Sequence, residues 1–119
     1  MPELPEVETV CRGIAPEITG KAIVSVQQNR PNLRYPFPEN FVAGLTGQSV
    51  LSVGRRSKYI LVHVSGDKCL VVHLGMSGTI EIVRPDGDYD ARKHDHFSFD
   101  FDDGTRLIYN DPRRFGFAL

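Results

Sequence analysis

The sequence has little cysteine, almost no net charge and no long apolar run. Its two cysteines, Cys11 and Cys69, form neither a CxxC nor a CxxH pattern, so neither a disulfide framework nor a zinc site is indicated, and reduced thiols are expected. The formal charge of −1 excludes bulk attraction to nucleic acid, so any polyanion binding must come from a local basic patch. An acidic start without an apolar run indicates neither a signal peptide nor a membrane span, so we expect a cytoplasmic protein without a membrane partner.

What is present is one domain of 119 residues without an internal repeat, a linker or a low-complexity tract. Apolar residues near the start recur at steps of three and four, which predicts a helix with one buried face: Leu4, Val7, Cys11, Ile14 and Ile18. Pro5 suits the first helical turn, whereas Pro16 predicts a break near Ala15. A second short helix is predicted over 38–45, with Gly47 just past its end.

The remaining pattern predicts strands. Residues 22–28 are rich in β-branched side chains, and from Val50 onward the apolar period changes to two. The candidate strands of this second part are 49–54, 58–64, 69–74, 79–84, 95–101 and 105–110. In 95–101 three phenylalanines alternate with His96, Ser98 and Asp100, which predicts one apolar and one solvated face. The fold class is therefore mainly β, an antiparallel two-layer β-sandwich of about seven or eight strands flanked by an N-terminal helix and a second short helix.

The first residues carry possible chemistry. If Met1 is removed, the ring nitrogen of Pro2 becomes a secondary amine with a pKa near ~8, which leaves a nucleophilic fraction at physiological pH. Glu3 and Glu6 stand beside it and could transfer protons. The same residues also suit the ordinary start of a helix, where proline and acidic side chains are common. Local composition leaves both interpretations open.

Three segments between predicted strands carry cations, an apolar tip or both. They are Arg55-Arg56-Ser57-Lys58, Gly75-Met76-Ser77-Gly78 and Asp111-Pro112-Arg113-Arg114-Phe115-Gly116. Each alone could be a solvated strand edge or a side chain that packs on the core. Together they suit binding of phosphates by cations and filling of a base stack by an apolar wedge. His73 could add a phosphate contact or be an ordinary strand residue, and His94-Asp95-His96 lacks a third ligand for a metal.

At this point the sequence resembles the formamidopyrimidine-DNA glycosylase family, in motifs that cover nearly the whole chain in the family's order. The motifs are Met1-Pro2-Glu3-Leu4-Pro5-Glu6-Val7-Glu8-Thr9, Arg55-Arg56-Ser57-Lys58-Tyr59, His73-Leu74-Gly75-Met76-Ser77-Gly78, Lys93-His94-Asp95-His96 and Asp111-Pro112-Arg113-Arg114-Phe115-Gly116. The Leu4-Pro5 pair favours this branch over the related endonuclease VIII branch. The resemblance implies that residues 1–119 are the N-terminal catalytic domain of a monomeric DNA repair enzyme. That enzyme would excise oxidised purines such as 8-oxoguanine from double-stranded DNA and then cleave the strand.

The resemblance also implies roles for individual residues. Pro2 resembles the nucleophile, Glu3 the acid that protonates the sugar, and Glu6 a supporting acid. Lys58 resembles a lysine that contacts phosphate and lesion, and His73 a phosphate contact. The residues that would fill the gap left by the flipped nucleotide are Met76, Arg113 and Phe115. Further cations that could contact DNA are Arg55, Arg56 and Arg114.

Two departures from the family pattern limit the activity that is expected of this chain. The family's helix–two-turn–helix module and four-cysteine zinc finger have no counterpart here, so we expect no cofactor in this chain and a zinc ion in the missing part. The chain also stops within a predicted strand, after Phe117-Ala118-Leu119, which predicts a truncated piece with weak DNA binding and little turnover. A retained Met1 would make the Pro2 nitrogen an amide, which is not a nucleophile. A non-catalytic module for damaged DNA and a plain β-sandwich interaction domain remain as alternatives.

Overall fold

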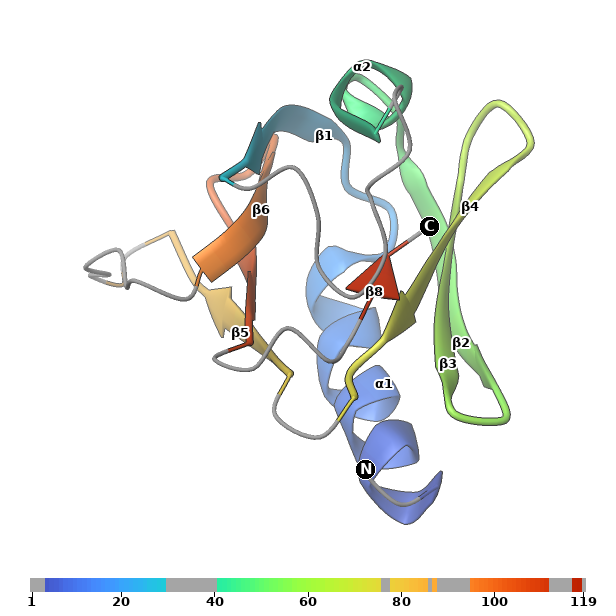
Figure 1. Cartoon of the computed structure of the whole chain (residues 1–119). Helices are drawn as coiled ribbons and strands as arrows, with labels where there is room; N and C mark the ends of the chain where they lie inside the picture. The colour runs from blue at the N-terminus through green and yellow to red at the C-terminus, as the bar shows by residue number, and fades with distance from the viewer. Residues whose placement is uncertain are drawn as a thin grey trace.

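Two antiparallel sheets stack face to face in the computed structural model, which describes residues 4–29, 41–75, 78–85, 87, 95–111 and 117–118 (Figure 1). The described residues form two helices and eight strands. One sheet has the order β1 (Ile23–Gln28), β6 (Asp95–Phe101), β7 (Arg106–Asn110) and β5 (Thr79–Val83). The other has the order β2 (Val50–Arg56), β3 (Tyr59–Val64), β4 (Lys68–His73) and β8 (Phe117–Ala118). The predicted β-sandwich is confirmed.

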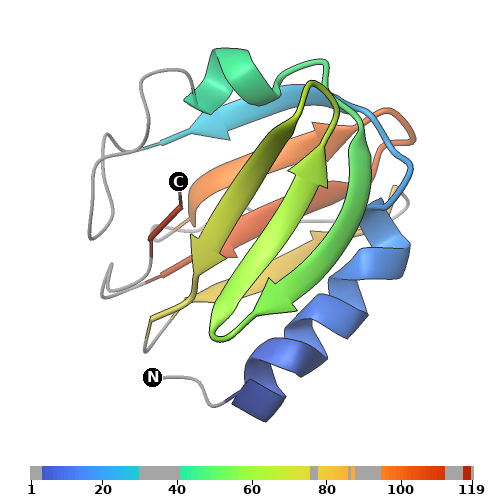
Figure 2. The same cartoon turned by 90° about the vertical axis from the view of Figure 1, so that its right-hand side faces the viewer.

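The helix α1 (Leu4–Ile18) runs beside β2 along one edge of the sandwich (Figure 2). Its described apolar residues at steps of three and four, from Val7 to Ile18, are buried as predicted. The predicted break at Pro16 is wrong, because the helix continues through Pro16 to Ile18. A proline in the last turn forfeits one helical hydrogen bond, while Ile14 and Ile18 on the inner face are only 4% and 1% exposed and hold the turn against the core.

The second helix, α2 (Phe41–Leu45), closes one end of the core. The Phe41 ring meets the Phe97 ring of β6 edge to face, with centroids 5.4 Å apart. Residues 38–40 of the predicted helix lie outside the described residues. The core between the sheets is filled by the inward residues of the strands, among them Ile60, Val62, Val64, Leu70, Val72, Phe97, Phe99 and Phe101.

The predicted solvated face of strand 95–101 is wrong. His96 is fully buried and Ser98 is 7% exposed, although Asp100 is partly exposed and pairs with Arg106. The reason is the position of β6 between β1 and β7, together with an irregular register between Asp95 and Phe97. A bulge there interrupts the alternation of faces, so His96 lies beside the core ring of Tyr109, with centroids 6.3 Å apart.

Turn geometry suits two of the connections between predicted strands. Gly66 and Asp67 have positive φ angles of 79° and 56° between β3 and β4, and Gly104 has a φ of 91° between β6 and β7. Strand bounds agree with the predicted ones to within two residues, and β2 extends to Arg56. Within the described ranges, no helix combines the length and the apolar character needed to cross a membrane.

Candidate nucleic-acid interface

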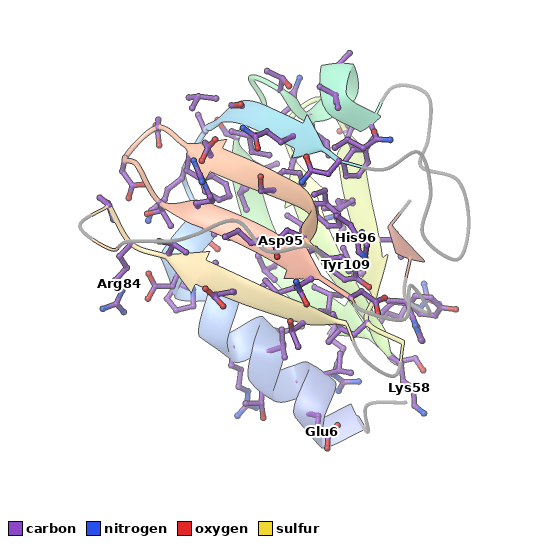
Figure 3. All side chains as sticks on the ribbon, turned by 60° about the vertical axis from the view of Figure 1, so that its left-hand side comes forward. Glu6, Lys58, Arg84, Asp95, His96 and Tyr109 are labelled. Carbon is purple, nitrogen blue, oxygen red and sulfur yellow. The ribbon has the colours of Figure 1, made fainter. Side chains whose placement is uncertain are left out.

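The described candidates gather at one end of the sandwich. The first turn of α1, the β2–β3 turn and the end of β4 lie together at that end in both views (Figures 1 and 2). Glu6 is exposed in the first turn of α1, and Figure 3 shows it at the same end as Lys58, far from Arg84. The predicted site residues outside the described residues are Pro2, Glu3, Met76, Arg113, Arg114 and Phe115.

The β2–β3 hairpin presents Lys58 at its tip. Arg56 pairs with Tyr59, so Ser57 and Lys58 form a two-residue turn. Ser57 has a φ of 54°, the left-handed conformation that such tight hairpin turns demand. Lys58 was predicted to begin a strand, and the structure places it in the turn instead. A turn position keeps the long lysine side chain clear of the ladder, where it can meet an anion.

Arg55 links the hairpin to α1. Its Nε donates to Glu8 Oε1 at 2.8 Å, and its Nη1 donates to the Ser57 carbonyl oxygen at 2.8 Å. Glu8 also accepts from Arg12 at 2.9 Å. The hydrogen bond from Arg55, and next that from Arg12, lowers the pKa of Glu8 below its ordinary value. The guanidinium therefore braces the turn that carries Lys58 against the helix that follows Pro2 and Glu3.

Arg56 and Lys58 differ from Arg55 in their partners. Within the described part of the chain, neither of them forms an ion pair, whereas Arg55 is paired with Glu8. Arg56 is exposed and Lys58 is half-buried. These two cations can therefore neutralise a phosphate without leaving a described acidic partner.

His73 ends β4 at the point where the chain leaves for the 75–78 turn. Its ring is buried, and its Nδ1 accepts the backbone N–H of Gly75 at 3.1 Å. An accepting Nδ1 puts the proton of a neutral ring on Nε2, the nitrogen that would then donate to a phosphate. The centroid of the Tyr59 ring, on the neighbouring strand β3, lies 5.4 Å from the centroid of the His73 ring. The predicted phosphate contact stays a prediction.

The sequence offered no signal for a buried polar cluster beside these loops. Tyr109 and Asp111 are both 0% exposed, and the Tyr109 hydroxyl donates to Asp111 Oδ2 at 2.9 Å. Burial, and next the negative charge of Asp111, raises the pKa of Tyr109 far above its ordinary value, so the phenol keeps its proton. The sequence pattern of the predicted strand 105–110 indicates only that the Tyr109 ring belongs to the core. Only the fold brings it to the loops.

The described residues offer no donor set for a metal ion, because no group of three or more histidines, cysteines or acids comes together within them. His94 lies outside the described residues. Cys11 is buried in α1 and Cys69 is exposed on β4. Burial raises the pKa of both thiols.

Comparison with known proteins supports the fold and identifies the family. The family model described as the formamidopyrimidine-DNA glycosylase N-terminal domain matches residues 1–118. The formamidopyrimidine-DNA glycosylases of Beijerinckia indica and Ruegeria pomeroyi are each 52% identical over 98% of this chain, which spans 42% and 43% of those proteins. The chain is thus less than half as long as these curated relatives.

Solved structures give the same match. The Lactococcus lactis Fpg in complex with DNA containing an abasic site is 36% identical, with a TM-score of 0.87 over 98% of this chain and 43% of the other. The Lactococcus lactis enzyme in complex with DNA containing FAPY-dG is 37% identical, with a TM-score of 0.86 over the same shares.

Proposed function

Because this chain belongs to the formamidopyrimidine-DNA glycosylase family, we propose that residues 1–119 form the catalytic N-terminal domain of a bifunctional base-excision repair enzyme. Its substrate is double-stranded DNA that contains oxidised purines such as 8-oxoguanine or formamidopyrimidines. The observation that carries the proposal is the gathering, at one end of the sandwich, of the first turn of α1 and the turn of Lys58.

Pro2 acts as the nucleophile once Met1 is removed. Its amine nitrogen bonds to the sugar C1′ while the bond from C1′ to the damaged base breaks, and the base leaves with the electron pair. Glu3 protonates the ring oxygen as the sugar opens, and the nitrogen loses its proton to give an iminium ion between Pro2 and C1′. The iminium withdraws electrons from the adjacent C–H bond. Loss of that proton expels one phosphate, a second elimination expels the other, and water releases the enzyme.

Electrostatics at the N-terminus act on this amine in two directions. The positive end of α1 favours the neutral amine and lowers its pKa, whereas the acids Glu3 and Glu6 raise it. Glu6 supports the site as a second acid. Lys58 holds the phosphate or the lesion near the amine. Its place at a hairpin tip, without an ion pair to any of the described residues, supports that role.

The loops supply the wedge and further phosphate contacts. Met76, Arg113 and Phe115 fill the space that the flipped nucleotide leaves. The cations that contact phosphates are Arg56 and Arg114, together with His73 through Nε2. Arg55 was predicted among them, and its pairing with Glu8 and Ser57 supports a bracing role for it instead.

The rest of a longer protein completes the enzyme. Relatives are more than twice as long as this chain, and the zinc ion implied by the family would belong to that remainder. We expect the 119-residue chain alone to bind DNA weakly and to turn over little. Borohydride trapping of this chain on 8-oxoguanine DNA at the rate of the full-length protein would contradict this expectation.

Borohydride trapping also tests the nucleophile, in the native protein that carries this chain. The wild type should form a covalent adduct with 8-oxoguanine DNA, and intact mass should show that Met1 is absent from the trapped protein. Pro2→Gly should lose base excision, while the control Pro5→Ala, also a proline near the helix start, should keep it. A different result would favour a non-catalytic module for damaged DNA. In that case the wild type would not excise the base, and Pro2→Gly would keep its affinity for DNA. Adduct on molecules that still carry Met1 would exclude Pro2.

A further inference from the structure

Two connections at the candidate interface lead from a strand of one sheet to a strand of the other. Residues 74–78 lead from β4 to β5, and residues 111–116 lead from β7 to β8. The strands that flank them are paired, since Thr79 lies opposite Asn110 and His73 lies opposite Phe117. The loops proposed to carry Met76 and Arg113 therefore start and end on neighbouring strands.

The Tyr109 hydroxyl lies at the base of the first connection. Gly78 closes that connection by donating its N–H to the Leu74 carbonyl oxygen at 2.9 Å. A Cβ atom at position 78 would lie only 2.6 Å from the Tyr109 hydroxyl oxygen, and closer still to the Leu74 carbonyl oxygen. No real side chain fits there, so the hydroxyl and the loop backbone are in direct contact.

The same hydroxyl holds the base of the second connection. It donates to Asp111 Oδ2 at 2.9 Å, and the Asp111 carbonyl oxygen accepts from His96 Nε2 at 2.6 Å. Asp111 is fully buried and directly precedes Pro112, so both its side chain and its backbone are fixed where this loop begins. The Tyr109 ring is itself stacked on Phe97, with centroids 5.0 Å apart and planes within 6°. Figure 3 shows His96 and Tyr109 beside each other in the sandwich.

We propose that Tyr109 is a positioning residue, whose hydroxyl sets the spacing of the 74–78 and 111–116 loops so that their side chains enter the same gap in the base stack. This inference rests on the proposed function of those loops. A rigid ring is suited to the task, because the strand and the Phe97 stack fix the hydroxyl while it touches both loop bases. Tyr109 does not touch substrate in this scheme. It acts through Gly78 and Asp111.

The test uses the native protein that carries this chain and needs no catalysis. Tyr109→Phe removes the hydroxyl and keeps the core ring. Amide hydrogen exchange should become faster at Gly78, whose N–H closes the first loop, and in the segment after Asp111. A duplex with 2-aminopurine beside a stable abasic analogue reports wedge insertion, and its fluorescence change should fall several-fold.

Two further variants keep the test sharp. Asp111→Asn retains an acceptor oxygen and should restore most of the insertion signal relative to Asp111→Ala, which should resemble Tyr109→Phe. The double variant Tyr109→Phe/Asp111→Ala should lose less signal than the sum of the two single losses, because both variants remove the hydrogen bond between Tyr109 and Asp111. Thr105→Val is the matched control, since it removes another buried hydroxyl just before β7, at the end away from both loops.

Three results would overturn the proposal. They are unchanged exchange at Gly78 in Tyr109→Phe, an unchanged insertion signal, or an equal loss of signal in Thr105→Val. A different result would contradict the proposed catalytic function, namely base excision that is retained in Pro2→Gly. The insertion signal would still report on Tyr109 in that case.

Discussion

Three neighbouring cations of the β2–β3 hairpin should contribute unequally to DNA binding. Arg56 and Lys58 have no acidic partner within the described residues, whereas Arg55 lies 2.8 Å from Glu8. A cation that binds phosphate releases condensed counterions from DNA, but one that must leave a carboxylate exchanges one anion for another. We therefore compare Lys58→Gln, Arg56→Gln and Arg55→Gln in the native protein that carries this chain.

The expected magnitude follows from counterion release. Each phosphate contact contributes about −0.9 to the slope of log K against log salt on duplex DNA. Lys58→Gln and Arg56→Gln should each make the slope shallower by about 0.9, so the affinity lost between about 50 and 200 mM salt shrinks by roughly 3.5-fold. Arg55→Gln should leave the slope within about 0.3 of the wild type, while the affinity itself should fall because the turn loses its brace.

Fluorescence anisotropy of a labelled duplex with a stable abasic analogue, titrated over a series of salt concentrations, measures these slopes. Lys68→Gln is a suitable control, because Lys68 is an exposed lysine at the start of β4 whose Nζ donates to the Gly44 carbonyl oxygen. Its slope should match the wild type. The reasoning fails if Arg55→Gln flattens the slope as much as Lys58→Gln does, or if Lys58→Gln has no effect.

Three further predictions concern stability and thiol chemistry. The hydrogen bond from Lys21 lowers the pKa of Asp103 from 3.8 to about 2. The stabilising contribution of the Asp103 carboxylate is therefore present above about pH 4 and is lost as the pH falls through about 2. Asp103→Asn should flatten the dependence of the free energy of unfolding on pH in that range. Peptide mapping after thiol labelling at neutral pH should find modified Cys69 and unmodified Cys11, with labelling faster at higher pH because both pKa values are raised; equal labelling of the folded protein would contradict this. Pro16→Ala should raise the free energy of unfolding by about 2 kcal/mol in urea titrations, since it restores a helical N–H and removes a ring clash, whereas a decrease would show that the helix depends on the proline.

The sequence by itself determined the elements and their order. The helical period of α1, the alternation in β3 and β4, and the turn residues Gly66 and Gly104 each expressed local preferences that the fold kept. It also determined the family, because motifs in a fixed order can be recognised without knowing which residues are in contact. The prediction failed at Pro16, where burial of Ile14 and Ile18 outweighs a local helix breaker.

Only the tertiary structure decided what the polar residues do. Arg55 looked like its neighbour Arg56, yet the packing of α1 against β2 gives Arg55 a carboxylate and leaves Arg56 without an ion pair within the described residues. His96 looked solvated, yet a bulge in an interior strand buries it beside Tyr109. The physical reason is the same in both cases. Local pattern records the preference of a side chain for water or for core, whereas the free energy of a charge or a hydroxyl depends on partners that are distant in the sequence.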